Sequence, residues 1–244
     1  LYQICFKKIV YFIINKLILI DTISYYWLKV AGRTGEFMKF TKMEGCGNDY
    51  VYVNGFEEKI DNPNEVAIAV SDRHFGIGSD GLIIINPSEV ADFKMCMYNA
   101  DGSEGKMCGN GIRCVAKYVY DFNLTDKDVI TVETLSGIKT LKLNVENGKV
   151  KTVRVNMGAP ILECDKVPVK YDDEKMINKP VKVDGKTFNI TCVSMGNPHA
   201  VTFINDTDNL EIEKIGPKFE THKLFPKKIN TEFAQIVDRN TIKM

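Results

Sequence analysis

The stretch "NADGSEGKMCGNGIRCVAKYVYDF", residues 99–122, changes abruptly from a polar, glycine-rich loop to a periodic apolar run. In the second part, apolar residues recur at the spacing i, i+3, i+4, i+7 and i+8, which places them in one stripe on an α-helix. These residues are Ile112, Val115, Ala116, Val119 and Tyr120. The pattern predicts a helix that begins just after Cys108.

Cys108 at the start of a helix is well placed for proton transfer. Gly109 and Gly111 allow close approach of the backbone, and the N–H groups of a helix start favour an anion. The same partial positive charge is expected to lower the pKa of Cys108 from about 8.5, so that the thiolate is accessible near neutral pH. A thiolate beside a bound carboxylate suits removal of the α-proton of an amino acid. The alternative for Cys108 is a buried loop cysteine without a chemical role. Cys114 lies beside the apolar stripe and is expected to be a packing residue.

The composition limits the classes of partner. The 244 residues suit one large or two modest domains, and 32 basic residues balance 32 acidic residues. A neutral chain does not favour nucleic acid or an anionic membrane surface as partner, so a small molecule or a protein is expected. The seven cysteines include no CxxC pair, which favours a reduced, cytoplasmic location over a disulfide framework. The three histidines have no spacing typical of a metal site, so no metal is predicted.

The first 37 residues differ from the rest, being dominated by isoleucine, tyrosine, phenylalanine and lysine. Lys16 and Asp21 interrupt the apolar runs well short of the roughly 20 residues that a spanning helix needs. No small-residue cleavage site follows, which argues against a signal peptide. We interpret residues 1–37 as a non-native or disordered extension, with Met38 as the natural start. An added amphipathic helix is the alternative.

From Met38 onward, strand and helix signals alternate. Helices are predicted after Cys108, near 211–222 and within 61–76, where Asn62 is a plausible cap, Pro63 takes the first helical position and Gly76 lies past the end. Strands are predicted at 38–43, 50–53, 82–85, 92–98, 139–145, 149–155, 181–183, 186–193, 200–204, 233–237 and 240–244. A boundary near "NMGAP" (156–160) divides the chain into two α+β halves with a similar order of elements. On this interpretation, the second half has no counterpart of the helix after Cys108.

The sequence "GIGSDG" at residues 76–81 matches the dinucleotide-binding pattern G-x-G-x-x-G letter for letter. In that fold the glycines follow a strand and open a helix, so that the helix N-terminus meets the pyrophosphate. Here the order is reversed, because a predicted helix precedes the glycines and a predicted strand follows them. We therefore expect a helix end and a turn.

The chain resembles the diaminopimelate epimerase family at short motifs that occur in order. They are "MEGCGNDYV" (43–51), "RHFGIGSDG" (73–81), "NADGSE" (99–104), "CGNGIRC" (108–114), "RVNMGAP" (154–160), "SMGNPH" (194–199) and, more weakly, "INTEFAQ" (229–235). The resemblance covers residues 38–244. It implies cofactor-independent epimerisation of LL-diaminopimelate to the meso form, in lysine and peptidoglycan precursor biosynthesis. It also allows a homodimer.

The fold implied by the resemblance is α+β, with two pseudo-symmetric lobes. Each lobe is a largely antiparallel sheet wrapped around a central helix, and the active site lies in the cleft between the lobes. We expect the N-terminal lobe at residues 38–155 and an incomplete C-terminal lobe at 156–244.

The family motifs also imply roles for individual residues. Cys108 corresponds to one of two catalytic cysteines that work on opposite faces of the substrate carbon, one as thiolate base and the other as thiol acid. His199 is placed with the catalytic residues, where it would support the cleft. The residues implied in substrate binding are Asn48, Asn99, Gly109, Asn110, Asn197 and Asn230. Gly109 and Asn110 would bind the reacting carboxylate.

The chain departs from the family pattern at the second cysteine, which lies in a Cys-Gly-Thr/Ser-Gly stretch. No such stretch occurs here, and Cys46, although followed by glycine, precedes a strand and not a helix. We therefore expect the 244-residue chain to be inactive by itself. Three other functions stay open: a racemase of the same superfamily with another substrate, a non-catalytic ligand-binding protein, and a thiol redox protein.

Overall fold

The computed structural model describes the backbone of residues 26–29 and 37–244, and it divides the chain into two units. Unit 1 runs to Asn156 and unit 2 is Met157–Met244. The predicted boundary lay between residues 155 and 156. Most of the predicted extension lies outside the described residues, but 26–29 form a strand. None of the helices in the described part of the chain is long and apolar enough to cross a membrane.

Unit 1 contains one curved, mainly antiparallel sheet in the strand order β1-β2-β3-β4-β5-β7-β8-β9, with β6 paired to β5. Its elements are β1 (Tyr26–Lys29), β2 (Phe37–Gly45), β3 (Asn48–Asn54), α1 (Pro63–Ser71), β4 (Gly81–Asn86), β5 (Phe93–Asn99), β6 (Glu104–Gly105), α2 (Gly109–Asp121), β7 (Val129–Thr134), β8 (Gly137–Glu146) and β9 (Lys149–Val155). Strands β3 and β4 are parallel, as are β5 and β7. The strand β7 was not predicted.

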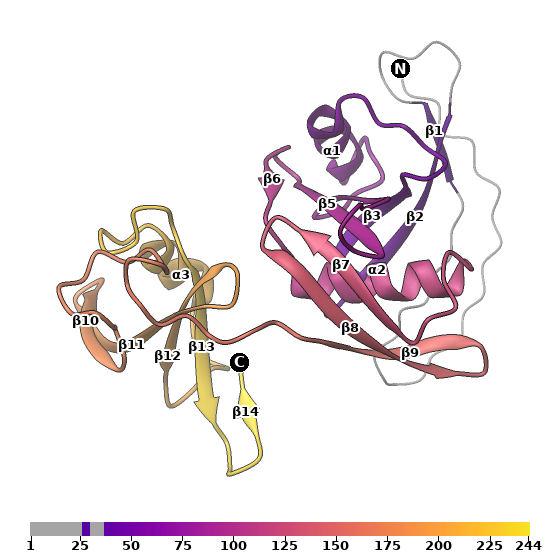
Figure 1. Cartoon of the computed structure of the whole chain (residues 1–244). Coiled ribbons are helices and arrows are strands. Elements are labelled where there is room, and N and C mark those ends of the chain that lie inside the picture. Colours follow the sequence, from indigo (N-terminus) through magenta and orange to yellow (C-terminus); the bar gives the residue numbers. More distant parts are fainter. Residues whose placement is uncertain (1–25, 30–36) are drawn as a thin grey trace. The chain divides into compact units, whose positions relative to one another are not determined.

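Helix α2 is the centre of unit 1, because the sheet curls around it (Figure 1). The helix packs against β2 and β3 near one end of the sheet and against β8 and β9 at the other. Four of the five residues of the predicted stripe are buried and Tyr120 is half-buried. Cys114 is buried too, which confirms its packing role. The sequence thus correctly predicted both the helix and the face that it buries.

The C-terminal end of α2 is fixed to β9 by a buried ion pair. The Lys117 Nζ lies 2.8 Å from the Asp121 Oδ2, and the two side chains are 14% and 5% exposed. Both side chains also bind the backbone of Val150. Lys117 donates to the Val150 carbonyl at 2.9 Å, and the Val150 N–H donates to Asp121 at 2.9 Å. Every polar group in this contact therefore has a partner, which is the condition for burying charge without a large loss of stability.

Helix α1 begins with Pro63 after Asn62, as predicted, but the Asn62 side chain makes no capping hydrogen bond. The helix ends at Ser71, and a turn follows in which the N–H groups of Ile77 and Gly78 donate to the Val70 carbonyl. Gly76 and Gly78 therefore lie in the turn after α1, and Gly81 is the first residue of β4. This order, with a helix before the glycines and a strand after them, is the one that the sequence predicted.

Unit 2 contains a five-stranded sheet in the order β10-β11-β12-β13-β14. Its elements are β10 (Lys179–Val183), β11 (Lys186–Ser194), β12 (Pro198–Phe203), α3 (Ile212–Glu220), β13 (Asn230–Ile236) and β14 (Ile242–Lys243). Phe219 of α3 is fully buried, with its ring 5.0 Å from Phe188 and 5.1 Å from Phe233 between centroids. Helix α3 and the sheet therefore share one apolar core.

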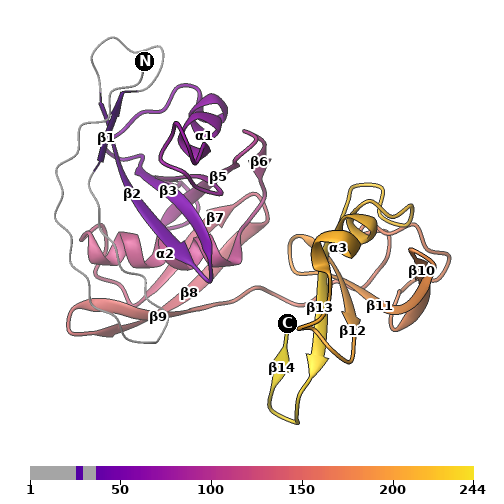
Figure 2. The same ribbon diagram turned by 180° about the vertical axis from the view of Figure 1, so that it is seen from behind.

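The two units repeat one plan of strand pairing (Figure 2). In unit 1, β2 and β3 form an antiparallel hairpin, α1 follows, β4 is parallel to β3, and β5 is antiparallel to β4. In unit 2, β11, β12, α3, β13 and β14 have the same order and the same directions. The predicted α+β class with two similar lobes is confirmed.

Candidate active site

The N-terminus of α2 holds Cys108, the residue that the sequence placed there. Cys108 is the N-cap residue, with an extended backbone, and its Sγ accepts a hydrogen bond from the Gly111 N–H at 3.3 Å. A Cβ on Gly111 would lie 2.8 Å from Ile83 Cδ1, so glycine allows this turn to press against β4. The first N–H groups of a helix lack intrahelical partners, and those of Gly109 and Asn110 are therefore suited to bind an anion.

The other described cysteines differ from Cys108 in their surroundings. Burial raises the pKa of the Cys114 thiol to about 11 and that of Cys192 to about 12, and it also raises the pKa of Cys164. These three are buried thiols and are unsuited to proton transfer with a ligand. Cys46 is exposed in the turn between β2 and β3, and Cys96 is half-buried in β5, where its Sγ accepts a hydrogen bond from the Asn86 Nδ2 at 3.4 Å. Among the described residues, no group of three or more histidine, cysteine or acidic side chains could hold a metal.

Two predicted substrate-binding residues, Asn48 and Asn110, are in direct contact. The Asn110 Nδ2 donates to the Asn48 Oδ1 at 3.0 Å, which joins the first turn of α2 to the start of β3. The backbones are also close, because a Cβ on Gly45 would lie 3.1 Å from the Asn110 carbonyl oxygen. The fold therefore brings together two asparagines that are 62 residues apart in sequence.

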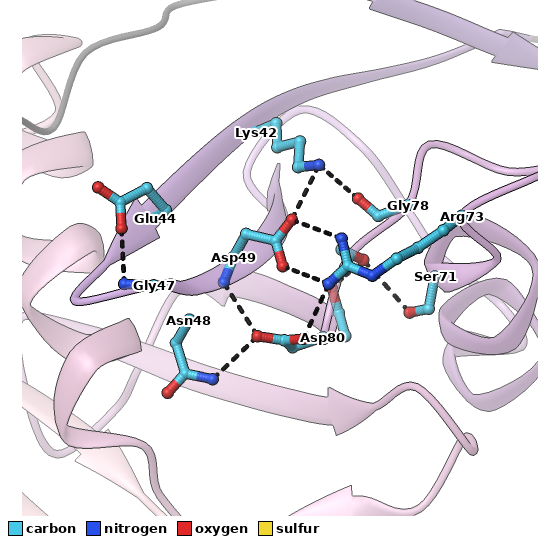
Figure 3. Close-up of polar contacts among 11 residues, drawn as sticks. Lys42, Glu44, Gly47, Asn48, Asp49, Ser71, Arg73, Gly78 and Asp80 are labelled. Carbon is cyan, nitrogen blue, oxygen red and sulfur yellow. Dashed lines mark hydrogen bonds and ion pairs between the residues drawn. The ribbon is translucent and has the colours of Figure 1, made fainter. Parts of the chain in front are cut away.

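Asn48 is hydrogen-bonded to a network of charged side chains (Figure 3). The Asp80 Oδ2 accepts from the Asn48 Nδ2 at 2.9 Å and from the Asp49 N–H at 3.1 Å. Arg73 donates to both oxygens of Asp49, at 2.8 and 3.2 Å, and to Asp80 at 3.0 Å. The Lys42 Nζ lies 2.9 Å from the Asp49 carboxylate. The network thus holds two carboxylates side by side, with Arg73 bound to both and Lys42 bound to Asp49.

The cations decide the ionisation of Asp49. Burial by itself would raise the pKa of this carboxyl group, but hydrogen bonds and positive charge from Arg73 and Lys42 outweigh burial. The pKa of Asp49 is lowered to about 2 as a result. Because the ordinary value is about 3.9, the folded state holds this carboxylate in its charged form more strongly than the unfolded state does.

We expect the ionised Asp49 to stabilise the fold fully above about pH 4 and progressively less as pH falls toward about 2. A folded pKa below the unfolded one contributes stability above the unfolded value, and this stability is lost as pH falls through the folded value. The free energy of unfolding of the wild type should exceed that of Asp49→Asn at pH 5, and the gap should shrink by about 2 kcal/mol by pH 2. Urea unfolding at both pH values measures the gap. A gap that does not change with pH would contradict the prediction.

Two tyrosines of β3 face the start of α2. The Tyr52 hydroxyl donates to the Gly111 carbonyl at 3.3 Å, and burial raises the pKa of Tyr52. Burial also raises the pKa of Tyr50, and the neighbouring Cys108 side chain adds to the rise. Both phenols are therefore neutral at physiological pH, and Tyr50 lies beside the thiol.

Asn99 lies at the end of β5, at the same end of the sheet as Asn48. It pairs in register with Gly81, which pairs in turn with Tyr50. The Asn99 Nδ2 donates to the Ser103 Oγ at 3.0 Å within the turn that follows β5. Unit 1 thus gathers five predicted site residues around one end of its sheet and the adjoining helix start. They are Asn48, Asn99, Cys108, Gly109 and Asn110.

The other predicted residues form a polar cluster in unit 2. The His199 Nδ1 lies 2.6 Å from the Glu232 Oε1, and the His199 Nε2 lies 2.9 Å from the Asn197 Oδ1. His199 pairs in register with Asn230, whose Nδ2 donates to the Pro198 carbonyl at 3.1 Å. The parallel pairing of β12 with β13 therefore brings together residues from the motifs "SMGNPH" and "INTEFAQ".

Sequence reasoning gave no role to four residues that hold the predicted ones in place. Arg73 and Asp80 lie within the motif "RHFGIGSDG", and Glu232 lies within "INTEFAQ". Arg113 follows the helix start by four positions, and its guanidinium donates to the Asn110 Oδ1 at 2.7 Å. The available signal was charge, because each is a charged residue inside one of the family motifs.

The family model and the relatives that match this chain in sequence are described as diaminopimelate epimerases. A family model described as diaminopimelate epimerase matches residues 40–163 and 191–244. A diaminopimelate epimerase of Acetivibrio thermocellus is 62% identical over 207 residues, covering 85% of this chain and 74% of that protein. A diaminopimelate epimerase of Methanococcus maripaludis is 58% identical over 207 residues, covering 85% of this chain and 75% of that protein.

Solved structures with the same fold are more distant in sequence. A probable proline racemase from Agrobacterium radiobacter K84 matches with a TM-score of 0.58 at 12% identity, covering 84% of this chain and 68% of that one. A PhzF-family phenazine biosynthesis protein of Bacillus anthracis matches with a TM-score of 0.52 at 18% identity, covering 83% and 68%. These likenesses support the fold, whereas the sequence matches over most of the chain decide the family. This chain belongs to the diaminopimelate epimerase family of isomerases.

Proposed function

We propose that this chain binds diaminopimelate and that Cys108 exchanges a proton with one of its α-carbons. Membership of the family supports diaminopimelate epimerisation as the activity. The observation that carries the proposal is the position of Cys108 as the N-cap residue of α2, directly before the N–H groups of Gly109 and Asn110. This arrangement puts a thiol and an anion-binding backbone next to each other.

The proposed chemistry needs no cofactor. The α-carboxylate of the substrate binds at the N–H groups of Gly109 and Asn110, and the Cys108 thiolate removes the α-proton. The C–H bond breaks, an S–H bond forms, and the electron pair stays on the substrate as a carbanion whose charge spreads into the carboxylate. Hydrogen bonds and the positive end of the helix stabilise this charge where it develops. Inversion of the centre requires a second thiol, on the opposite face, that returns a proton to the carbanion.

The polar residues of the two units are proposed as substrate contacts. Asn48 and Asn99 stand at the end of the sheet in unit 1, and Asn197 and Asn230 stand beside His199 in unit 2. The Glu232 carboxylate 2.6 Å from the His199 Nδ1 fixes the orientation of the imidazole ring. His199 is proposed to support catalysis by its position.

None of the described cysteines is assigned as the second proton carrier. Cys114, Cys164 and Cys192 are buried in the packing of their units. Cys46 is exposed, but it lies in a hairpin turn and has no helix start to bind a carboxylate. Exchange of the α-proton and inversion of the α-carbon are therefore separate questions for this chain.

Incubation in heavy water separates them. Because no second proton carrier is assigned, we expect the chain to replace the α-proton of diaminopimelate by deuterium, observed by proton NMR, without inverting the α-carbon, and to leave proline unlabelled. Chiral chromatography of the same samples reports inversion. Exchange that is faster with proline would instead indicate a racemase with another substrate. Binding without exchange of either compound would contradict the proton-transfer role of Cys108.

A further inference from the structure

Asn48 and Asn110, called here the asparagine pair, lie between two charged side chains. An asparagine amide has a donating and an accepting end that differ little in shape, so the amide can face either way unless its partners decide. A site that recognises a ligand through amides therefore needs groups that determine which end faces which way.

Asp80 determines the direction at one end of the pair. A carboxylate only accepts hydrogen bonds, so the amide end of Asn48 that faces it at 2.9 Å must be the Nδ2. Asp80 cannot turn away freely, because Arg73 donates to its other oxygen at 3.0 Å. The Oδ1 of Asn48 consequently points away from Asp80, toward Asn110.

Arg113 determines the direction at the other end. A guanidinium only donates, so the end of Asn110 that faces it at 2.7 Å must be the Oδ1. Arg113 is itself held by a bond to the Gly109 carbonyl at 2.9 Å. The Nδ2 of Asn110 is then left to donate to the Asn48 Oδ1 at 3.0 Å, as observed.

We infer that Asp80 and Arg113 are positioning residues that together fix the direction of both amides of the asparagine pair before a ligand binds. The hydrogen bonds form one directed chain, in which Arg113 donates to Asn110, Asn110 donates to Asn48, and Asn48 donates to Asp80. Each asparagine uses only some of its donors and acceptors in this chain. Asn48 keeps one N–H and one oxygen lone pair for a ligand. A zwitterionic amino-acid group offers the matching carboxylate and ammonium, so this inference rests on the proposed function for its ligand.

The asparagine side chains form a continuous hydrogen-bonded route between the two charged ends, and this gives a test without ligand. In Asp80→Asn, the side-chain amide proton shifts should change not only at Asn48 but also at Asn110. In Arg113→Met, the change should likewise reach Asn48. The amide signals are assigned from their loss in Asn48→Ala and Asn110→Ala. Glu89→Gln, which removes an exposed carboxylate elsewhere in unit 1, is the matched control and should leave both signals in place.

Calorimetric titration with diaminopimelate measures the effect on recognition. We expect the dissociation constant to rise about tenfold in Asp80→Asn and in Arg113→Met, as for loss of one charged hydrogen-bonding partner. Arg113→Lys keeps a donor and should recover part of the loss, whereas a merely structural role would leave it as weak as Arg113→Met.

The outcomes distinguish this inference from the proposed function. If the wild type does not bind diaminopimelate, the proposed ligand is wrong, and the amide signals alone decide whether the directed chain exists. If each variant shifts only the asparagine that it contacts, or if both variants bind as tightly as the wild type, the inference is overturned. Since the two variants lie on different elements, one that fails to fold leaves the other as the test.

Discussion

Replacing Cys108 with serine is expected to lower the rate of α-proton exchange in diaminopimelate by at least about a thousandfold. A serine hydroxyl ionises so weakly that it cannot act as the base, although it has nearly the shape of the thiol. The change should leave the fold intact, because the serine oxygen can still accept the N–H of Gly111 that now bonds to Sγ at 3.3 Å. The exchange assay in heavy water measures the rate, and a thermal melt measures the fold.

Cys46→Ser is the matched control for this loss. Cys46 is exposed whereas Cys108 is half-buried; Cys46 is also followed by glycine, but it lies in a turn and not at a helix start. We expect its exchange rate to stay within about threefold of the wild type, the spread usual for surface changes. Equal losses of exchange rate in Cys108→Ser and Cys46→Ser would mean that Cys46 also takes part in proton transfer, or that both substitutions lower the rate by a general effect on the protein. An unaffected Cys108→Ser would remove the basis of the proposed chemistry.

Replacing Asp121 with alanine is expected to have the largest effect on stability, a loss of about 3 kcal/mol in the free energy of unfolding. The change leaves the ammonium group of Lys117, which is 14% exposed, without its counter-ion at 2.8 Å. It also removes the acceptor of the Val150 N–H. Because α2 carries Cys108 at its other end, exchange activity should fall together with stability. Urea unfolding gives the free energy.

A double variant shows whether the cost comes from the unpaired charge. In Lys117→Met with Asp121→Leu, both charges are replaced by apolar side chains of similar size, which is often neutral for a buried pair. We expect it to recover most of the stability lost in Asp121→Ala. If the double variant is as unstable as the single one, the loss comes from the severed contact with β9 and not from the buried charge of Lys117.

The local parts of the fold could be predicted from the sequence because their signals are short-range. The stripe on α2 repeats within 13 residues, and the turn "NG" between β8 and β9 needs two left-handed residues. Asn147 and Gly148 do have φ values of 51° and 74°. Strand β7 was missed although it carries a local signal, because Ile130, Val132 and Thr134 alternate with less buried residues and the strand forms an antiparallel hairpin with β8.

The candidate site also has some features that the local sequence predicts and others that depend on contacts between distant segments. Cys108 could be placed at a helix start because the glycines and the apolar period lie beside it. The support of Asn48 by Asp80, 32 residues away, depends on the parallel pairing of β3 with β4, which no local pattern announces. The contact of Glu232 with His199 depends in the same way on β12 and β13. Family motifs named the asparagines, but only the fold gives the groups that orient them.

The plan of pairing that occurs in both units has a consequence for the ancestry of the chain. A hairpin, a crossover helix and two further strands with identical directions in both units are what tandem duplication of one gene segment leaves behind. Asn48 and Asn197 flank the hairpin turn of their own units and would descend from one ancestral asparagine. The Asp80 contact of the first and the His199 contact of the second would then be later divergences, acquired separately as each copy specialised.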